Sequence, residues 1–418
     1  MSTNKLARDG GTPAIREPLP GGGCGIELIG EEEIAAVTEV LRGKKLFRFG
    51  VGTECTELEA EIAAWLGTGH VLFLSTGTAA LVCALSGMGI GPGDEVIVPG
   101  YTYIATAAAV VAVGAVPVIA EIDDSLGLDP ADVRAKITPY TRAIIPVHMQ
   151  GVPCRLQELR QLADEKGLLL LEDSCQAVGA SYRGKKVGTW GHAGAWSLNY
   201  YKAITCGEGG AVFTDDPVII ERAQFQSDPA LPMWKGNTEW LTPPFSRECY
   251  RGNEVTAAIA RVQLRKLPRI LDHCRALKRE LLSLLDTPQH YVRQHVDDPD
   301  GELGISFAMI AHTPELACRM SELLLAEGLT IGSAYNSGFP DRHIYRYWDS
   351  ILNKHGATPA GYPWRDPAYH GKVEYSPEMC PHTLDLLSRA LRLSIHLNLT
   401  SDHIAQIAEA INKVDAGM

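Results

Sequence analysis

Short apolar runs alternate with segments of helical periodicity from about residue 70 to residue 214. This alternation is typical of βα units that form a mainly parallel sheet. The predicted strands span residues 71–74, 95–98, 116–119, 143–147, 168–171, 193–198 and 210–213. The predicted helices between them span residues 78–85, 102–113 and 156–166. We therefore expect an α/β fold.

The flanking segments divide the rest of the chain. Residues 1–29 are rich in glycine and proline and predict an extended arm. A helical pattern runs from residue 255 to 284 across Pro268, and we expect it to bridge a large domain (30–267) and a smaller α+β domain (268–418). Within the latter, Thr313 offers a helix N-cap, and a final helix begins near Thr400.

Length and composition limit the possible functions. A chain of 418 residues exceeds the size of one core, which supports two domains. The net charge of -12 argues against nucleic acid or an anionic membrane as partner. The longest apolar stretch, 104–120, contains Gly114 and Pro117, so no membrane span is expected. Ten cysteines without a Cys-x-x-Cys pair indicate reduced thiols in the cytoplasm and no metal site.

Three stretches could carry chemistry. The apolar run LLLED ends in Asp173, where an open α/β sheet places its ligands, although an aspartate after a strand can also cap a helix. Lys202 lies between a predicted strand and the glycine-rich run GEGG; burial there would favour a reactive neutral amine, whereas most lysines are simply solvated. The turn STGT at 75–78 precedes a helix, whose first N–H groups can bind phosphate.

Taken together, these stretches match one cofactor. Pyridoxal phosphate (PLP) needs a phosphate site, a carboxylate for its pyridine nitrogen and a lysine amine for its aldehyde. The turn at 75–78, Asp173 and Lys202 supply one each. We therefore predict a PLP enzyme.

Six motifs in order resemble the DegT/DnrJ/EryC1/StrS sugar aminotransferase family, of PLP fold type I. They are STGTAAL (75–81), DEVIVP (94–99), PVH (146–148), LEDSCQA (171–177), SLNYYK (197–202) and GEGGAV (207–212). The resemblance covers nearly the whole chain from about Gly30. It implies a seven-stranded mixed sheet in the large domain and a homodimer with shared active sites.

The resemblance also implies roles for individual residues. Lys202 would form the Schiff base, Asp173 would face the pyridine nitrogen, and Gln176 would lie beside the phenolic oxygen. The remaining predicted cofactor contacts are the phosphate contacts Ser197, Gly77 and Thr78, and the stacking ring of Tyr103. Without its neighbours in the motif, Tyr103 would be interpreted as a core aromatic residue.

One segment departs from the family pattern. Where the family has an asparagine that reaches the phosphate of the neighbouring subunit, the run CYRGNE (249–254) has Cys249. A thiol is a poorer hydrogen-bond donor than an amide, so either the phosphate has another partner or this segment is reshaped. Arg251 in this run and Arg48 in LFRFG (46–50) are candidate substrate contacts, although for Arg48 alone a surface position is the stronger expectation.

The resemblance implies amino transfer from glutamate or glutamine to a keto-sugar, keto-cyclitol or keto-deoxy sugar acid. One branch of the family acts on keto-cyclitols and aminohydroxybenzoate precursors, and the runs GGTP (10–13) and LFRFG resemble this branch. Other members aminate an eight-carbon keto-deoxy sugar acid, and the pair Phe47-Arg48 and the run ITCGE (204–208) resemble these enzymes. An aromatising lyase of the aminohydroxybenzoate synthase type remains an alternative, because it keeps the lysine.

Two other classes fit less well. A non-catalytic PLP or sugar-binding regulator would not need Lys202 or Asp173. A nicotinamide dehydrogenase would need its glycine run directly after a strand, whereas Gly87, Gly89 and Gly91 follow a predicted helix and should end it.

Overall fold

The computed structural model describes residues 5–236, 239–333, 335 and 340–418. Its main sheet has seven strands in the order β1-β9-β8-β5-β4-β2-β3, and only β9 runs opposite to the others. These strands are β1 (His70–Leu74), β2 (Glu95–Pro99), β3 (Val116–Ala120), β4 (Thr141–Ile144), β5 (Leu169–Asp173), β8 (Ala193–Ser197) and β9 (Gly210–Thr214). The predicted α/β fold with a mainly parallel mixed sheet is confirmed.

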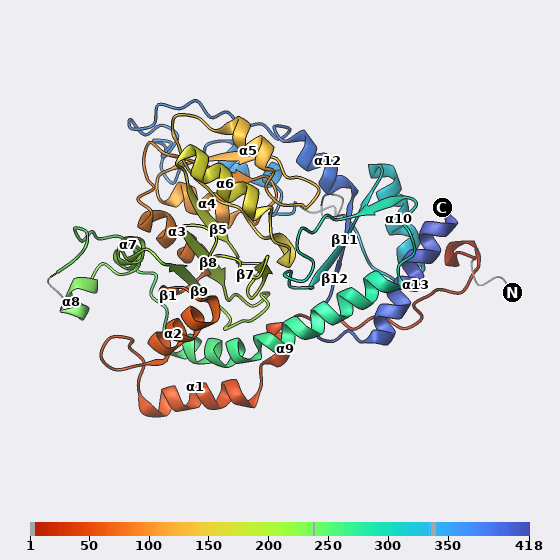
Figure 1. The fold of residues 1–418 in the computed structure, drawn as a ribbon, viewed down its shortest axis with the longest axis horizontal. Coiled ribbons are helices and arrows are strands. Elements are labelled where there is room, and N and C mark those ends of the chain that lie inside the picture. The colour runs from red at the N-terminus through yellow and green to blue at the C-terminus, as the bar shows by residue number, and fades with distance from the viewer. Residues whose placement is uncertain (1–4, 237–238, 334, 336–339) are drawn as a thin grey trace.

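Helices cover both faces of this sheet (Figure 1). Phe73 packs in the cluster that contains α2 and α9, whereas its neighbours Leu72 and Leu74 pack in the cluster that contains α3, α4 and α7. Burial on both faces explains why the strands are continuous apolar runs. The helices that flank the sheet include α2 (Glu54–Leu66), α3 (Gly77–Gly87), α4 (Ala105–Ala112), α5 (Pro130–Lys136), α6 (Leu156–Lys166) and α7 (Pro217–Ser227). Helix α1 (Glu31–Gly43) packs against helix α9 (Glu254–Leu284) instead.

The long helix α9 (Glu254–Leu284) runs without interruption through Pro268, as predicted, and reaches from the main sheet to a second, antiparallel sheet (Figure 1). This sheet has the order β10-β11-β12. The elements of this part are β10 (Tyr291–Arg293), β11 (Ser306–Ala311), α10 (Pro314–Ala326), α11 (Asp349–Leu352), α12 (Pro381–Arg389), β12 (Ala390–Ser394) and α13 (Ser401–Gly417). The short elements β6 (Ser181–Tyr182), β7 (Lys185–Lys186) and α8 (Leu231–Lys235) complete the described chain. The domain boundary at 267/268 falls inside α9 and stays a prediction.

The largest differences between predicted and observed boundaries are at the end of β4 and the start of α4. The strand predicted at 143–147 is β4, which ends at Ile144 just before the segment containing Pro146, a residue without an N–H for a ladder bond. The helix predicted at 102–113 begins only at Ala105, because the backbone of residues 100–104 bonds to the segment 342–345 instead.

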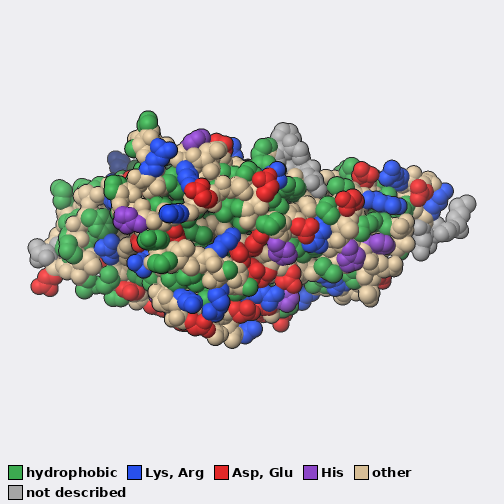
Figure 2. All heavy atoms as spheres, turned by 90° about the horizontal axis from the view of Figure 1, so that it is seen from above, with side chains coloured by type: hydrophobic (Ala, Val, Ile, Leu, Met, Phe, Trp, Pro, Cys, Tyr) green, Lys and Arg blue, Asp and Glu red, His purple; other side chains and the backbone are tan. Residues whose placement is uncertain are grey.

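On the face seen in Figure 2, acidic and basic side chains are interspersed. Among the described residues, no helix is both long and apolar enough to cross a membrane.

The N-terminal arm is fixed by one buried carboxylate. Glu327, which is 0% exposed and follows α10, accepts the N–H groups of Ala7 (2.8 Å) and Ala14 (3.0 Å) and the ammonium group of Lys413 (2.7 Å). A buried charge that loses its partner is strongly destabilising. The arm is therefore held by hydrogen bonds to this carboxylate as well as by packing.

Replacing Glu327 with alanine is expected to lower the free energy of unfolding by roughly 3–5 kcal/mol, because Lys413 would stay buried without its counter-charge. Urea unfolding of both chains measures this difference. Glu322→Ala is the matched control: its exposed ion pair with Arg8 (3.3 Å) should contribute less than about 1 kcal/mol. Equal losses in the two variants would contradict this account of the arm.

Candidate functional site

The predicted site residues gather at the carboxyl end of the central strands. Parallel β5 and β8 align Asp173 with Ala195, so the last residue of β8, Ser197, lies just beyond Asp173 at the same edge. On the other side of β8, antiparallel β9 pairs Gly210 with Ser197 and also with Leu74, the last residue of β1. The sheet order therefore brings the three predicted chemical stretches together.

Asp173 is a buried carboxylate, 4% exposed, with a hydrogen-bond donor for each oxygen. Its Oδ1 accepts the N–H of Cys175 (3.1 Å), and its Oδ2 accepts the hydroxyl of Thr106 (2.8 Å). The bond from the Cys175 N–H closes a turn and does not cap a helix, because no helix directly follows β5 in this described segment. These two donors hold the carboxylate in one orientation.

The turn before α3 is packed tightly against the end of β8. A Cβ atom added to Gly77 would lie 2.6 Å from the Cβ of Ser197 and 3.0 Å from its hydroxyl oxygen. The Thr76 hydroxyl caps α3 by accepting the N–H of Ala79 (3.0 Å), and Thr78 is exposed in the first turn. First-turn N–H groups lack helical acceptors, so this helix start and the Ser197 hydroxyl can receive an anion together.

Lys202 lies on a tight turn between β8 and β9. Its backbone N–H donates to the Asn199 carbonyl (3.0 Å), and the N–H of Asn199 donates to the Ser197 hydroxyl (3.3 Å). Burial raises the pKa of the Cys175 thiol well above its usual value; the charge of Asp173 adds to this shift and that of Lys202 opposes it. Lys202 and Asp173 thus act electrostatically on the same thiol.

The other two predicted cofactor contacts lie on neighbouring loops. Gln176 is half-buried after β5, and its side-chain oxygen accepts the N–H of Gln150 (3.1 Å). The ring of Tyr103 is 49% exposed and lies 5.4 Å from the ring of His343, so it is not the core residue of the alternative interpretation. An exposed ring on the loop after β2 is available for stacking.

The two candidate substrate arginines already have partners within the chain. Arg48 is 10% exposed and donates to the Glu59 carboxylate (2.8 Å) and to the Phe73 carbonyl (3.2 Å). Arg251 pairs with Asp228 (3.2 Å) and bridges Leu74 at the end of β1. Arg48 is therefore not the surface arginine of the alternative interpretation, and a substrate role for either residue stays a prediction.

The segment with the unusual cysteine lies along the end of β1. The N–H of Ser75 donates to the Tyr250 carbonyl (2.9 Å), and the N–H of Gly252 donates to the Phe73 carbonyl (3.3 Å). Cys249 itself is exposed. This segment therefore stabilises the β1 turn of its own chain.

Sequence reasoning missed a contact of the Asp173 carboxylate and a buried pair beside it in the chain. Thr106 contacts the carboxylate, and the hydroxyl of Thr102, four residues before Thr106, lies 2.8 Å from the Thr106 hydroxyl. Behind the strand, the buried side chains of His148 and Glu172 lie 3.2 Å apart. No local pattern indicates the Thr106 contact, because Thr106 and Asp173 lie 67 positions apart in the sequence.

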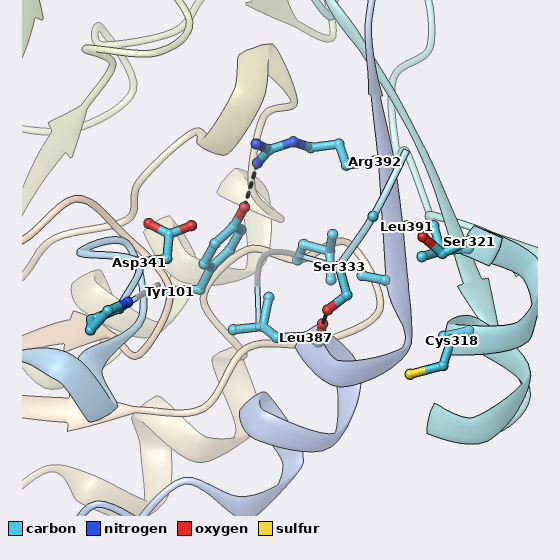
Figure 3. A pocket seen from close by; sticks show the side chains of 13 residues that line it. Tyr101, Cys318, Ser321, Ser333, Asp341, Leu387, Leu391 and Arg392 are labelled. Carbon is cyan, nitrogen blue, oxygen red and sulfur yellow. Dashed lines mark hydrogen bonds between the residues drawn. The ribbon is translucent and has the colours of Figure 1, made fainter. Parts of the chain in front are cut away.

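A cavity of about 700 Å³ lies away from this group, between the loop after β2 and the elements α10, α12 and β12 (Figure 3). The guanidinium of Arg392 donates to the Tyr101 hydroxyl (2.7 Å) at its edge, and Asp341 lies beside that tyrosine. None of the predicted cofactor contacts lines it. We therefore identify the site by the residues at the strand ends rather than by this cavity.

Comparison with known proteins gives the same family as the motifs. The family model described as the DegT/DnrJ/EryC1/StrS aminotransferase family matches residues 27–349. The chain is 36% identical over 361 residues to the L-glutamine:2-deoxy-scyllo-inosose aminotransferase of Streptomyces kanamyceticus, covering 80% of this chain and 82% of that protein. It is 41% identical over 256 residues to the dTDP-3-amino-3,4,6-trideoxy-alpha-D-glucose transaminase of Streptomyces venezuelae, covering 60% and 66%.

Comparison with solved structures supports the same family assignment. The crystal structure of 3-amino-5-hydroxybenzoic acid synthase is similar with a TM-score of 0.78 and 26% identity, covering 96% of this chain and 100% of that one. The structure of S. venezuelae DesV in complex with a ketimine intermediate is similar with a TM-score of 0.72 and 32% identity, covering 91% and 93%. From the matched motifs, the fold and these relatives together, the chain belongs to the DegT/DnrJ/EryC1/StrS aminotransferase family.

Proposed function

We propose that this chain is a PLP-dependent transaminase that moves an amino group from glutamine or glutamate to a keto-cyclitol or keto-sugar. The observation that carries this proposal is that Asp173 and Ser197 end adjacent strands at one edge of the sheet, and that Lys202 lies on the turn that follows Ser197. The acceptor class is supported by the names of the relatives, one of which acts on 2-deoxy-scyllo-inosose and takes its amino group from L-glutamine.

The residues present fit PLP. A buried carboxylate with two donors suits a protonated ring nitrogen, and the glycine at position 77 keeps open the space between the α3 start and the Ser197 hydroxyl. We assign the phosphate to Ser197, Gly77 and Thr78, the ring nitrogen to Asp173 and the aldehyde to Lys202. Tyr103 would stack on the ring, and Gln176 would lie beside the phenolic oxygen.

When bound, PLP supplies an aldehyde and a ring that accepts an electron pair from the substrate. Lys202 would hold the aldehyde carbon, and its amine, once freed by the donor, would take the proton from the donor α-carbon. Asp173 would keep a proton on the ring nitrogen, which would make that proton transfer easier. The donor would leave as a keto acid, and Lys202 would return a proton to the acceptor carbon when the amino group replaces the ketone oxygen.

We further propose a homodimer with shared active sites, working in the cytoplasm. Large apolar side chains lie exposed on the loop before α2 and around α8, including Leu46, Met233 and Leu241. Exposed apolar side chains of this kind are typical of a protein interface. A monomer in sedimentation velocity that still transfers amino groups would contradict this assembly.

An aromatising lyase is the second candidate function, because of the similarity to 3-amino-5-hydroxybenzoic acid synthase. Product mass separates the two: transamination exchanges a ketone oxygen for an amine, whereas aromatisation loses water. We would incubate the PLP-loaded chain with L-glutamine and a panel of keto-cyclitols, keto-sugars and aminohydroxybenzoate precursors. An aminated product supports the proposal; dehydration alone would support the lyase, and no product with any acceptor would contradict both.

Replacing Gly77 with alanine is expected to weaken PLP binding about tenfold or more, because the new methyl group would displace Ser197. Overpacking of this kind costs roughly 1–3 kcal/mol. Titration of the apo chain with PLP, followed by absorbance, measures the dissociation constant. Gly91→Ala is the matched control, since its Cβ would meet only the Val113 carbonyl at 3.6 Å; unchanged binding in Gly77→Ala would contradict the phosphate assignment.

A further inference from the structure

The orientation of Asp173 depends on a residue distant in sequence. Its bond to the Cys175 N–H is local and moves with the turn itself. Its bond to the Thr106 hydroxyl (2.8 Å) spans 67 positions and joins the end of β5 to α4. Only the second bond fixes the carboxylate relative to the loop that carries Tyr103.

The Thr106 hydroxyl is part of a directional chain. Both Thr106 and Thr102 are 1% exposed, so their hydroxyls have no access to bulk water. Because the Thr106 hydrogen is donated to Asp173, its oxygen is left to accept the hydroxyl of Thr102 at 2.8 Å. Such a chain strengthens each bond and holds the last acceptor in one orientation.

The helix adds to this effect. Thr106 lies in the first turn of α4, which begins at Ala105, so Asp173 lies against the positive end of the helix dipole. A hydroxyl donor and a helix start are both complementary to a carboxylate oxygen, so both act on the orientation of the Asp173 side chain.

We infer that Thr106 is a positioning residue that holds the Asp173 carboxylate aimed at the cofactor ring nitrogen. The inference rests on the proposed function. Valine has nearly the shape of threonine but lacks the hydroxyl, so Thr106→Val removes one bond, whereas Thr106→Ser keeps it.

A double-mutant cycle on PLP binding tests this. We would titrate the apo forms of the wild-type chain, Thr106→Val, Asp173→Ala and the double variant with PLP and measure each dissociation constant. If Thr106 acts through the carboxylate, Thr106→Val weakens binding about tenfold in the wild-type background and less than about twofold in the Asp173→Ala background. Thr106→Ser should stay within about threefold of the wild type and restore the rate of the half-reaction with L-glutamine.

The outcomes are distinct. Wild-type affinity in Thr106→Val, or the same loss in both backgrounds, would overturn the inference and leave the proposed function standing. Failure of Thr106→Ser to restore binding and rate would overturn it as well. A wild-type chain that takes up no PLP would overturn the proposed function and the inference together.

Discussion

Replacing Lys202 with alanine is expected to lower the rate of amino transfer by about three orders of magnitude or more. The lysine amine has two tasks in the proposed mechanism, holding the aldehyde carbon and moving the proton, and proton transfer alone is typically worth about 10²–10⁴-fold. The measurement is the single-turnover rate with L-glutamine, which reports the first half-reaction without the acceptor. The visible absorbance that PLP gains on joining a lysine should also be lost.

The matched control is Lys166→Ala. Lys166 is exposed at the end of α6, on the loop that enters β5 rather than the one that leaves it. Its removal should leave the rate and the absorbance unchanged. Full turnover by Lys202→Ala would show that another amine, or another mechanism, carries the reaction.

Replacing Asp173 with asparagine is expected to lower the same rate roughly 10²–10³-fold, the usual effect of removing one oriented electrostatic group. Asparagine has nearly the same shape and can still accept from Thr106, but it carries no charge to keep the ring nitrogen protonated. PLP should still join Lys202, so the absorbance would survive while the rate falls.

Asp216→Asn is the control for this substitution. Asp216 caps α7 by accepting the N–H of Val218 (2.7 Å), and asparagine is an equally good cap. Its rate should match the wild type. If Asp173→Asn were equally active, the carboxylate would have another role, such as holding its loop.

The fold could be predicted where local pattern decides the structure. Strands buried on both faces leave uniform apolar runs, and for this reason all seven strands of the main sheet were placed within a few residues. The helix α7 was missed although Asp216-Pro217 is a clear start signal. The start of α4 was misplaced because residues 100–104 bond to a segment some 240 positions later, which no local pattern reports.

The candidate site could also be predicted only where local sequence patterns determine it. Its motifs lie at strand ends, and the sheet order then brings Asp173, Ser197 and Gly77 together. Contacts between distant segments could not be predicted from the sequence. The hydrogen bond from Thr106 to Asp173 and the ion pair between Arg48 and Glu59 depend on which segments become neighbours in the fold. An isolated arginine in a motif does not show whether its partner is a substrate or its own chain.

The most direct test of the central claim is to find the amine that bonds PLP. The PLP-loaded chain would be reduced with borohydride, digested and examined by peptide mass spectrometry. We predict the reduced cofactor on the peptide that contains Lys202, and only there. Modification of a different lysine, or none at all, would contradict the account.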